Sequence, residues 1–300
     1  MCTKTLAASK KRKKSVTLTH TQTKQKTLRN AIHFQGVGLF SGQETTLSLI
    51  PQKENTGIVF ERLDLKKQIP LSLEYLDAAT FNCTGLSKDG VKVHTIEHLL
   101  SALLAYNISN LLIQIDNQEI PIFDGSAKVF VDEIEKVGVC ELDAIQEGIQ
   151  IDTPIFFSKE DVTLIALPHP SFKVSYTFFY PKSKRFSSQF LSVDINPQTF
   201  KEEISFARTF AFYDDIAPFI EMGLVKGADF ERGLLIKNDK VQNNSLHRED
   251  ELVRHKILDL VGDLALLGKP LFGHIVAIRS GHKTNTVLAR QLQQCEGVNV

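Results

Sequence analysis

The sequence predicts an α+β protein of two related halves, each a mixed sheet layered on helices, with the active site between them. Three observations predict this fold. Segments that alternate with period two dominate the chain after its first 25 residues, helical apolar spacing is confined to a few stretches, and the second half repeats the order of elements in the first. A chain of 300 residues can form one or two domains.

Strand patterns fill the first part of the chain. Between residues 26 and 64, period-two alternation is interrupted by glycine-containing turns, which indicates an antiparallel sheet. Apolar residues three and four apart then predict a helix over 95–106, which Asn107 ends. The segment LLIQI over 111–115 is a short strand that leads into a polar loop. A helix packed on a sheet is the expected result.

The second half repeats this order. A helical pattern ends at Gly268, the strand GHIVAIRS follows, and a Gly-His turn precedes a final helix. When His98 is set beside His255, Asp124 and His282 follow at nearly equal separations of 26 and 27 residues. Each half therefore has a histidine-bearing helix, a strand and a loop with a polar residue, which favours two related halves that face each other.

Composition divides the chain into three regions. Residues 1–24 are rich in Ser, Thr and basic residues and poor in apolar ones, which predicts a disordered basic tail. Residues 25–145 and 146–300 are the two predicted α+β domains, separated in the polar stretch ELDAIQEG. The tail fits a solubilising extension, and attraction to anionic lipid headgroups or organelle targeting are the alternatives.

The distribution of charge argues against nucleic acid as a partner. Nine of the 35 basic residues lie before residue 31 and the first acidic residue is Glu44, so the remaining 26 basic residues stand against 35 acidic ones. A surface that follows phosphates needs a clustered excess of Lys and Arg on the folded part of the protein. We therefore expect no nucleic-acid binding.

Cysteine and apolar patterns indicate the compartment. The four cysteines are far apart and form no CxxC pair, and no apolar segment follows the basic start, so neither a disulfide framework nor a secretory signal is predicted. No segment approaches the roughly 18 consecutive apolar residues of a membrane-spanning helix. We expect a cytoplasmic monomer with at most peripheral membrane contact.

The stretch HKILDLVGD carries the first candidate site. His255, Asp259 and Asp263 are four residues apart, so an imidazole and two carboxylates share one face of the predicted helix. A solvated stripe of charged residues is the plain interpretation of this pattern. In the functional interpretation, His255 and Asp259 offer ligands to one metal ion from successive turns and Asp263 is an orienting partner.

The stretch HTIEH carries the second candidate site. It fits the H-x-x-E-H pattern of inverted zinc peptidases, in which His94 and His98 would bind zinc and Glu97 would activate water. The preceding residues GVKV have a strand pattern, and a non-helical His94 would leave His98 as the ligand with Glu97 as base. Together with His255 and Asp259, His98 then completes a His, His, Asp set with one open position, which is typical of catalytic zinc.

His282 is a third candidate, on the predicted turn after a strand. A single histidine on a turn is usually an exposed bystander. It can serve as the acid that complements Glu97 only if the symmetry of the halves brings it near the metal.

Seven segments together resemble the UDP-3-O-acyl-N-acetylglucosamine deacetylases, the zinc amidohydrolases of lipid A biosynthesis, from Thr27 to the C-terminus. They are GVGLFSG (Gly36–Gly42), HTIEHLLSAL (His94–Leu103), EIPIFDGSA (Glu119–Ala127), SFARTFAF (Ser205–Phe212), GLVKG (Gly223–Gly227), VRHKILDLVGDL (Val253–Leu264) and SGHKTN (Ser280–Asn285). Seven segments in the right order and spacing are far more specific than any one of them.

The resemblance implies zinc-dependent hydrolysis of the N-acetyl group of UDP-3-O-acyl-N-acetylglucosamine, with release of acetate, at an early committed step of lipid A biosynthesis. It implies that a Zn²⁺ ion is ligated by His98, His255 and Asp259, and that Glu97 is the general base.

The resemblance also implies roles for residues around the metal. His282, oriented by Asp263, would stabilise the oxyanion and protonate the leaving amine, and Thr209 would donate a hydrogen bond to the tetrahedral intermediate. Lys256 and Phe210 would help to hold the UDP-sugar.

The family fold implies an insert around residues 210–236 that builds a hydrophobic passage for the acyl chain. Two positions depart from the family pattern: Phe40 stands where histidine is usual, and Gly227-Ala228-Asp229 replaces a common GGS. Two alternatives stay open, a zinc peptidase that uses the HxxEH motif and a non-catalytic protein that binds a nucleotide sugar or lipid precursor.

Overall fold

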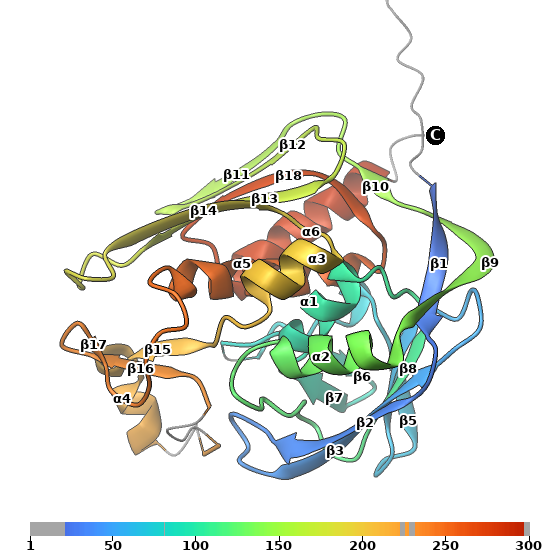
Figure 1. The fold of residues 1–300 in the computed structure, drawn as a ribbon, viewed down its shortest axis with the longest axis horizontal. Helices are drawn as coiled ribbons and strands as arrows, with labels where there is room; N and C mark the ends of the chain where they lie inside the picture. Colours follow the sequence, from blue (N-terminus) through green and yellow to red (C-terminus); the bar gives the residue numbers. More distant parts are fainter. Residues whose placement is uncertain (1–21, 81, 223–225, 228–231, 297–300) are drawn as a thin grey trace, which may run out of the picture.

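The computed structural model describes residues 22–80, 82–222, 226–227 and 232–296. Within them the chain forms two principal sheets with helices layered between them (Figure 1). The predicted α+β class with two related halves is confirmed. Residues 1–21 of the predicted tail and the departure at Ala228-Asp229 lie outside the described residues.

The first half is built on a five-stranded sheet in the order β2-β3-β8-β4-β5. Its strands are β2 (Ile32–Val37), β3 (Glu44–Pro51), β4 (Ile58–Arg62), β5 (Lys67–Pro70) and β8 (Leu111–Ile115). Its helices are α1 (Glu97–Ala105) and α2 (Lys128–Val137), with a 3-10 turn at Leu73–Tyr75 and a hairpin of β6 (Gly85–Lys88) and β7 (Val91–His94). The apolar positions of the alternating strands are buried, as the period-two pattern predicts.

The second half is built on a sheet in the order β11-β12-β18-β13-β14, with β10 (Ile149–Gln150) paired to β18. Its strands are β11 (Ile155–Lys159), β12 (Val162–Leu167), β13 (Phe172–Phe179), β14 (Ser188–Asp194) and β18 (Leu271–Ile278). Its helical segments are α3 (Pro197–Thr199), a π-helical turn at Phe200–Ile204, α5 (Glu251–Leu264), a 3-10 turn at Ala265–Leu267 and α6 (His282–Glu296).

The two sheets have the same topology. In each five-strand order, the strand that comes last in the chain lies between the second and third strands and pairs in parallel with the third, β8 with β4 and β18 with β13. The short strand β10 is also parallel to β18. In each half a histidine-bearing helix, α1 or α5, precedes this strand and a second helix follows it. The internal symmetry predicted from the sequence is therefore a property of the fold.

Helices α1 and α5, the equivalent helices of the two halves, pack against each other at Gly262. A Cβ atom added to Gly262 would lie 2.1 Å from the backbone oxygen of Glu97, so a larger residue would push the helices apart. This close approach places the start of α1 beside α5.

A two-stranded antiparallel ribbon of β1 (Gln22–Leu28) and β9 (Val139–Glu147) connects the halves (Figure 1). The predicted limit of the tail was therefore wrong for residues 22–24, which pair with residues 145–147. Both segments look polar in the sequence because the ribbon leaves many side chains exposed, while their backbone groups find partners in each other. The ribbon also continues past the boundary predicted at residue 145.

The segment that resembles the family insert forms a small separate unit (Figure 1). It consists of β15 (Phe210–Phe212), α4 (Tyr213–Glu221), β16 (Leu234–Lys237) and β17 (Lys240–Val241), with the three strands in one sheet. The unit extends a few residues beyond the predicted range of 210–236. In the part of the chain that the structure describes, no helix has the length and apolar character that crossing a bilayer requires.

Candidate active site

Three buried side chains converge where α1 meets α5. His98 is the second residue of α1, and His255 and Asp259 lie one turn apart on α5. Nε2 of His255 is 3.2 Å from Oδ1 of Asp259, and Nε2 of His98 is 3.9 Å from the same oxygen. The three ligand atoms all lie within 4.8 Å of one another. Two imidazole nitrogens and one carboxylate oxygen are a donor set that fits a catalytic zinc ion with an open position.

The protonation states of these side chains suit a metal ion. Nδ1 of His255 lies 3.0 Å from the carbonyl oxygen of Ala207, to which it donates, and this leaves the lone pair of Nε2 free. Burial, with His255 as a second cause, lowers the pKa of His98 to about 3, so its imidazole is neutral. Although burial alone would raise the pKa of Asp259, His255 and Lys256 hold it well below its usual range.

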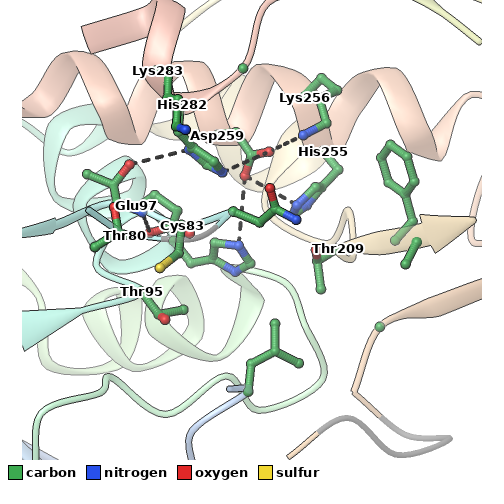
Figure 2. A pocket seen from close by; sticks show the side chains of 18 of the residues that line it. Thr80, Cys83, Thr95, Glu97, Thr209, His255, Lys256, Asp259, His282 and Lys283 are labelled. Atoms are coloured by element: carbon green, nitrogen blue, oxygen red, sulfur yellow. Dashed lines mark hydrogen bonds and ion pairs between the residues drawn. The ribbon is translucent and has the colours of Figure 1, made fainter. Parts of the chain in front are cut away.

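Glu97 precedes His98 and is also buried. Its Oε2 accepts a hydrogen bond of 3.0 Å from the backbone N–H of Thr84. Burial raises the pKa of Glu97 to about 7, so the carboxylate can take up and release a proton near neutral pH. In Figure 2, Glu97 lies on the same side of the cluster as His282, and Thr209 lies on the opposite side.

His282 is the first residue of α6, not part of a preceding turn as the sequence predicted. Its Nδ1 lies 3.0 Å from Oδ2 of Asp263, a residue that is fully buried. The same carboxylate oxygen also accepts a hydrogen bond of 2.8 Å from Nδ2 of Asn285. Burial alone would lower the pKa of His282, but Asp263 raises this pKa to about 10. A cation at a helix N-terminus opposes the helix dipole, so Asp263 is what keeps this imidazole charged. Nε2 is left to face the cluster, 4.0 Å from Oδ2 of Asp259.

The cluster opens into a cavity of about 1080 Å³. The cavity is lined by the three candidate ligands, Glu97 and His282. It is also lined by apolar side chains of the insert, namely Phe212, Ile216, Phe219 and Leu235. A cavity with both charged and apolar lining suits a ligand that has both a polar group and a hydrocarbon chain.

Comparison with known proteins places the chain in a family. The family model for UDP-3-O-acyl N-acetylglycosamine deacetylase matches residues 25–294. The UDP-3-O-acyl-N-acetylglucosamine deacetylase of Chlamydia pneumoniae is 38% identical over 272 residues, which cover 89% of this chain and 96% of the relative. That of Chlamydia abortus is 41% identical over 270 residues, with coverage of 89% and 96%. The chain belongs to the UDP-3-O-acyl-N-acetylglucosamine deacetylase family. The resemblance predicted from seven segments is confirmed.

The residues expected from the deacetylase family come together in one place. The cavity is lined by the predicted ligands His98, His255 and Asp259, by Glu97 and His282, and by Thr209, Lys256 and Phe210. Asp263 lies behind His282, in contact with its ring. Residues separated by more than 180 positions in the chain, such as Glu97 and His282, thus share one cavity.

Lys256, which the sequence resemblance assigned to the UDP-sugar, forms an ion pair with Asp259. Its Nζ lies 2.6 Å from Oδ2 of Asp259 and 5.5 Å from the centre of the Phe210 ring. Burial alone would lower the pKa of Lys256, but Asp259 raises this pKa to about 12. The ammonium group therefore balances the charge of a candidate metal ligand as well as facing the cavity.

The peptidase alternative, in which His94 and His98 bind one metal ion, is wrong. His94 ends strand β7, and Thr95 has a left-handed φ of 57°, so the two histidines do not share a helix. Nε2 of His94 lies 3.4 Å from a carboxylate oxygen of Asp77, and His94 is not one of the three clustered ligands. The deacetylase family assignment agrees with this geometry.

A pair of variants separates these two histidines experimentally. His255→Ala should lose most of its bound metal because it removes one of the three candidate ligands, whereas His94→Ala should keep a metal content close to that of the unaltered protein. Metal analysis of both purified variants measures this. Loss of metal from His94→Ala alone would contradict the assigned ligand set.

Sequence reasoning missed three groups of the site. The carbonyl of Ala207 had no signal, because any residue supplies a carbonyl. Asn285 follows His282 by three positions, so helical spacing could have placed both on one face. Thr84 lies in a loop before a short hairpin, and no local pattern links it to residues of α1, α5 or α6.

Proposed function

We propose that this protein hydrolyses the N-acetyl group of UDP-3-O-acyl-N-acetylglucosamine and releases acetate in lipid A biosynthesis, with Zn²⁺ as its metal ion. The observation that carries the proposal is the His98, His255 and Asp259 cluster, which lies beside a buried carboxylate and a charged imidazole in one cavity. Relatives 38–41% identical to this chain are named as deacetylases of this substrate. When bound, zinc supplies a Lewis acid and lowers the pKa of a bound water from about 15.7 towards 7.

Glu97 is the proposed general base. Its near-neutral pKa suits removal of a proton from water, and its burial keeps competing solvent away. Because Oε2 is held by the N–H of Thr84, we assign the proton transfer to Oε1.

His282 is the proposed electrostatic stabiliser and general acid. With Nδ1 bonded to Asp263, its Nε2–H can face the negative charge that develops on the amide oxygen and then protonate the leaving amine. Thr209, across the cluster in Figure 2, offers its hydroxyl as a second donor. Donors that are held in position before charge develops stabilise that charge without reorganisation during the reaction.

Substrate binding divides between charge and apolar contact. Acidic residues outnumber basic ones in the folded part of the chain, so attraction of the whole protein cannot bring in a diphosphate. Lys256, Lys283 and Arg290 line the cavity and can supply local positive charge, while the ring of Phe210 can pack on the sugar. The apolar side chains of the insert would receive the acyl chain.

The test is acetate release from the UDP-sugar with and without a chelator. We expect the chelator to abolish release and added zinc to restore it. Shortening the acyl chain should lower kcat/KM by about fourfold for each methylene that leaves an apolar contact, because one buried methylene contributes about 0.8 kcal/mol. Full activity after metal removal would contradict the proposal, and substrate binding without acetate release would favour the non-catalytic alternative. The cytoplasmic location, monomeric state and peripheral membrane contact stay predictions.

A further inference from the structure

Thr84 contacts both the proposed general base, Glu97, and the Asp263–His282 pair that forms the proposed general acid. It is 1% exposed and lies just before strand β6. Its backbone N–H donates 3.0 Å to Oε2 of Glu97 at the start of α1. Its hydroxyl donates a hydrogen bond of 2.5 Å to Oδ1 of Asp263 on α5, and the hydroxyl oxygen lies 3.3 Å from Nδ1 of His282. One residue therefore joins the proposed base to the pair that forms the proposed acid.

The direction of these hydrogen bonds follows from their chemistry. An ionised carboxylate only accepts, so the single hydroxyl proton of Thr84 goes to Asp263. The lone pairs of the same oxygen can then face the N–H at Nδ1 of His282. Asp263 thus receives three donors, from Thr84, Asn285 and His282, and these fix both the plane of the carboxylate and the orientation of the imidazole.

Thr84 is itself held in place. Its carbonyl oxygen accepts 3.2 Å from the N–H of Ile96, next to Glu97. At the following residue, a Cβ atom added to Gly85 would lie 2.7 Å from the ring of His94 and 2.8 Å from the side chain of Thr80. The backbone at Thr84 and Gly85 is therefore closely packed and hydrogen-bonded, so Thr84 can act as a fixed support.

We propose that Thr84 is a positioning residue that aligns Glu97 and His282 with each other across the interface of the two halves. The amide orients the base and the hydroxyl orients the Asp263–His282 pair. This inference rests on the proposed deacetylase function, because it assigns Thr84 a part in that reaction.

The test compares Thr84→Val with Thr84→Ser. Valine has nearly the same shape but no hydroxyl, and loss of a partner that orients a catalytic group typically costs about 10- to 100-fold in activity. We expect Thr84→Val to lower kcat by this factor with little change in KM or zinc content, and Thr84→Ser to retain most of kcat. The matched control is Thr45→Val, since Thr45 is also 1% exposed and its hydroxyl has no hydrogen-bond partner among the described residues. That control should keep normal activity.

A double-mutant cycle tests whether Thr84 acts through Asp263. In an Asp263→Asn background the further loss caused by Thr84→Val should shrink below about threefold, because the two residues act as one unit. Independent, multiplicative losses would overturn the inference, as would normal kcat in Thr84→Val or a serine variant as impaired as the valine one. If valine prevents folding, Thr84→Ala takes its place in both comparisons. Absence of acetate release by the unaltered protein would instead defeat the proposed function.

Discussion

Glu97→Gln is expected to lower kcat for acetate release by about 10²- to 10⁴-fold, the range that a positioned general base contributes. Glutamine has the same size and can still accept the N–H of Thr84 through its carbonyl oxygen. It cannot remove a proton from water. Glu97 is not one of the three clustered candidate ligands, so the metal content should stay near that of the unaltered protein.

Steady-state kinetics together with metal analysis measures this prediction. Glu61→Gln is the matched control, because the Glu61 carboxylate accepts from Gln68 and Gln114 on the first sheet and does not line the cavity. Its activity should be unchanged. If Glu97→Gln keeps its turnover, or if its metal content falls in proportion to its activity, Glu97 is not the base.

His282→Ala is the second large effect, with kcat lowered by about 10²- to 10³-fold, as for the loss of one donor to an oxyanion. The imidazole carries a positive charge that Asp263 maintains, so the variant loses both the stabilising charge and the acid. KM should change less than kcat, because this interaction strengthens only as charge develops in the transition state.

The pH profile gives a second readout for His282. The protonated form is the active one and its pKa is raised to about 10, so activity should be present below that pH and fall as pH rises through it. The residual activity of His282→Ala should lack this fall. His33→Ala, an exposed histidine on β2 bonded to Ser48, is the control and should retain the full profile. Near-normal turnover of His282→Ala would refute the assigned role.

Local spacing was enough to identify much of the site. His255, Asp259 and Asp263 are four residues apart, and helical geometry alone aligns them on one face of α5. The matching order of elements in the two halves also followed from the chain, because apolar periodicity reports secondary structure and a repeated order reports a repeated fold. The ligand set needed the further condition that His94 be excluded, and the sequence left that open.

Contacts between distant segments settled the remaining questions. His94 leaves the helix because Thr95 adopts a left-handed conformation between β7 and α1, which no propensity predicts for threonine. Residues 22–24 join a strand because β9, more than 110 residues later, supplies their hydrogen-bond partners. Local periodicity predicts neither the position of His94 outside the helix nor the strand at residues 22–24.

The sequence alone was sufficient for the fold class and the family, and it supplied the candidate site residues, since these depend on residue type and on spacing within single helices and strands. The packing of α1 on α5 at Gly262 was needed to bring His98 to His255. The loop at Thr84 was needed to join Glu97 to Asp263, which lies 179 positions after Thr84 in the chain. Such contacts depend on how the two halves pack together, and side-chain spacing along the chain carries no information about that packing.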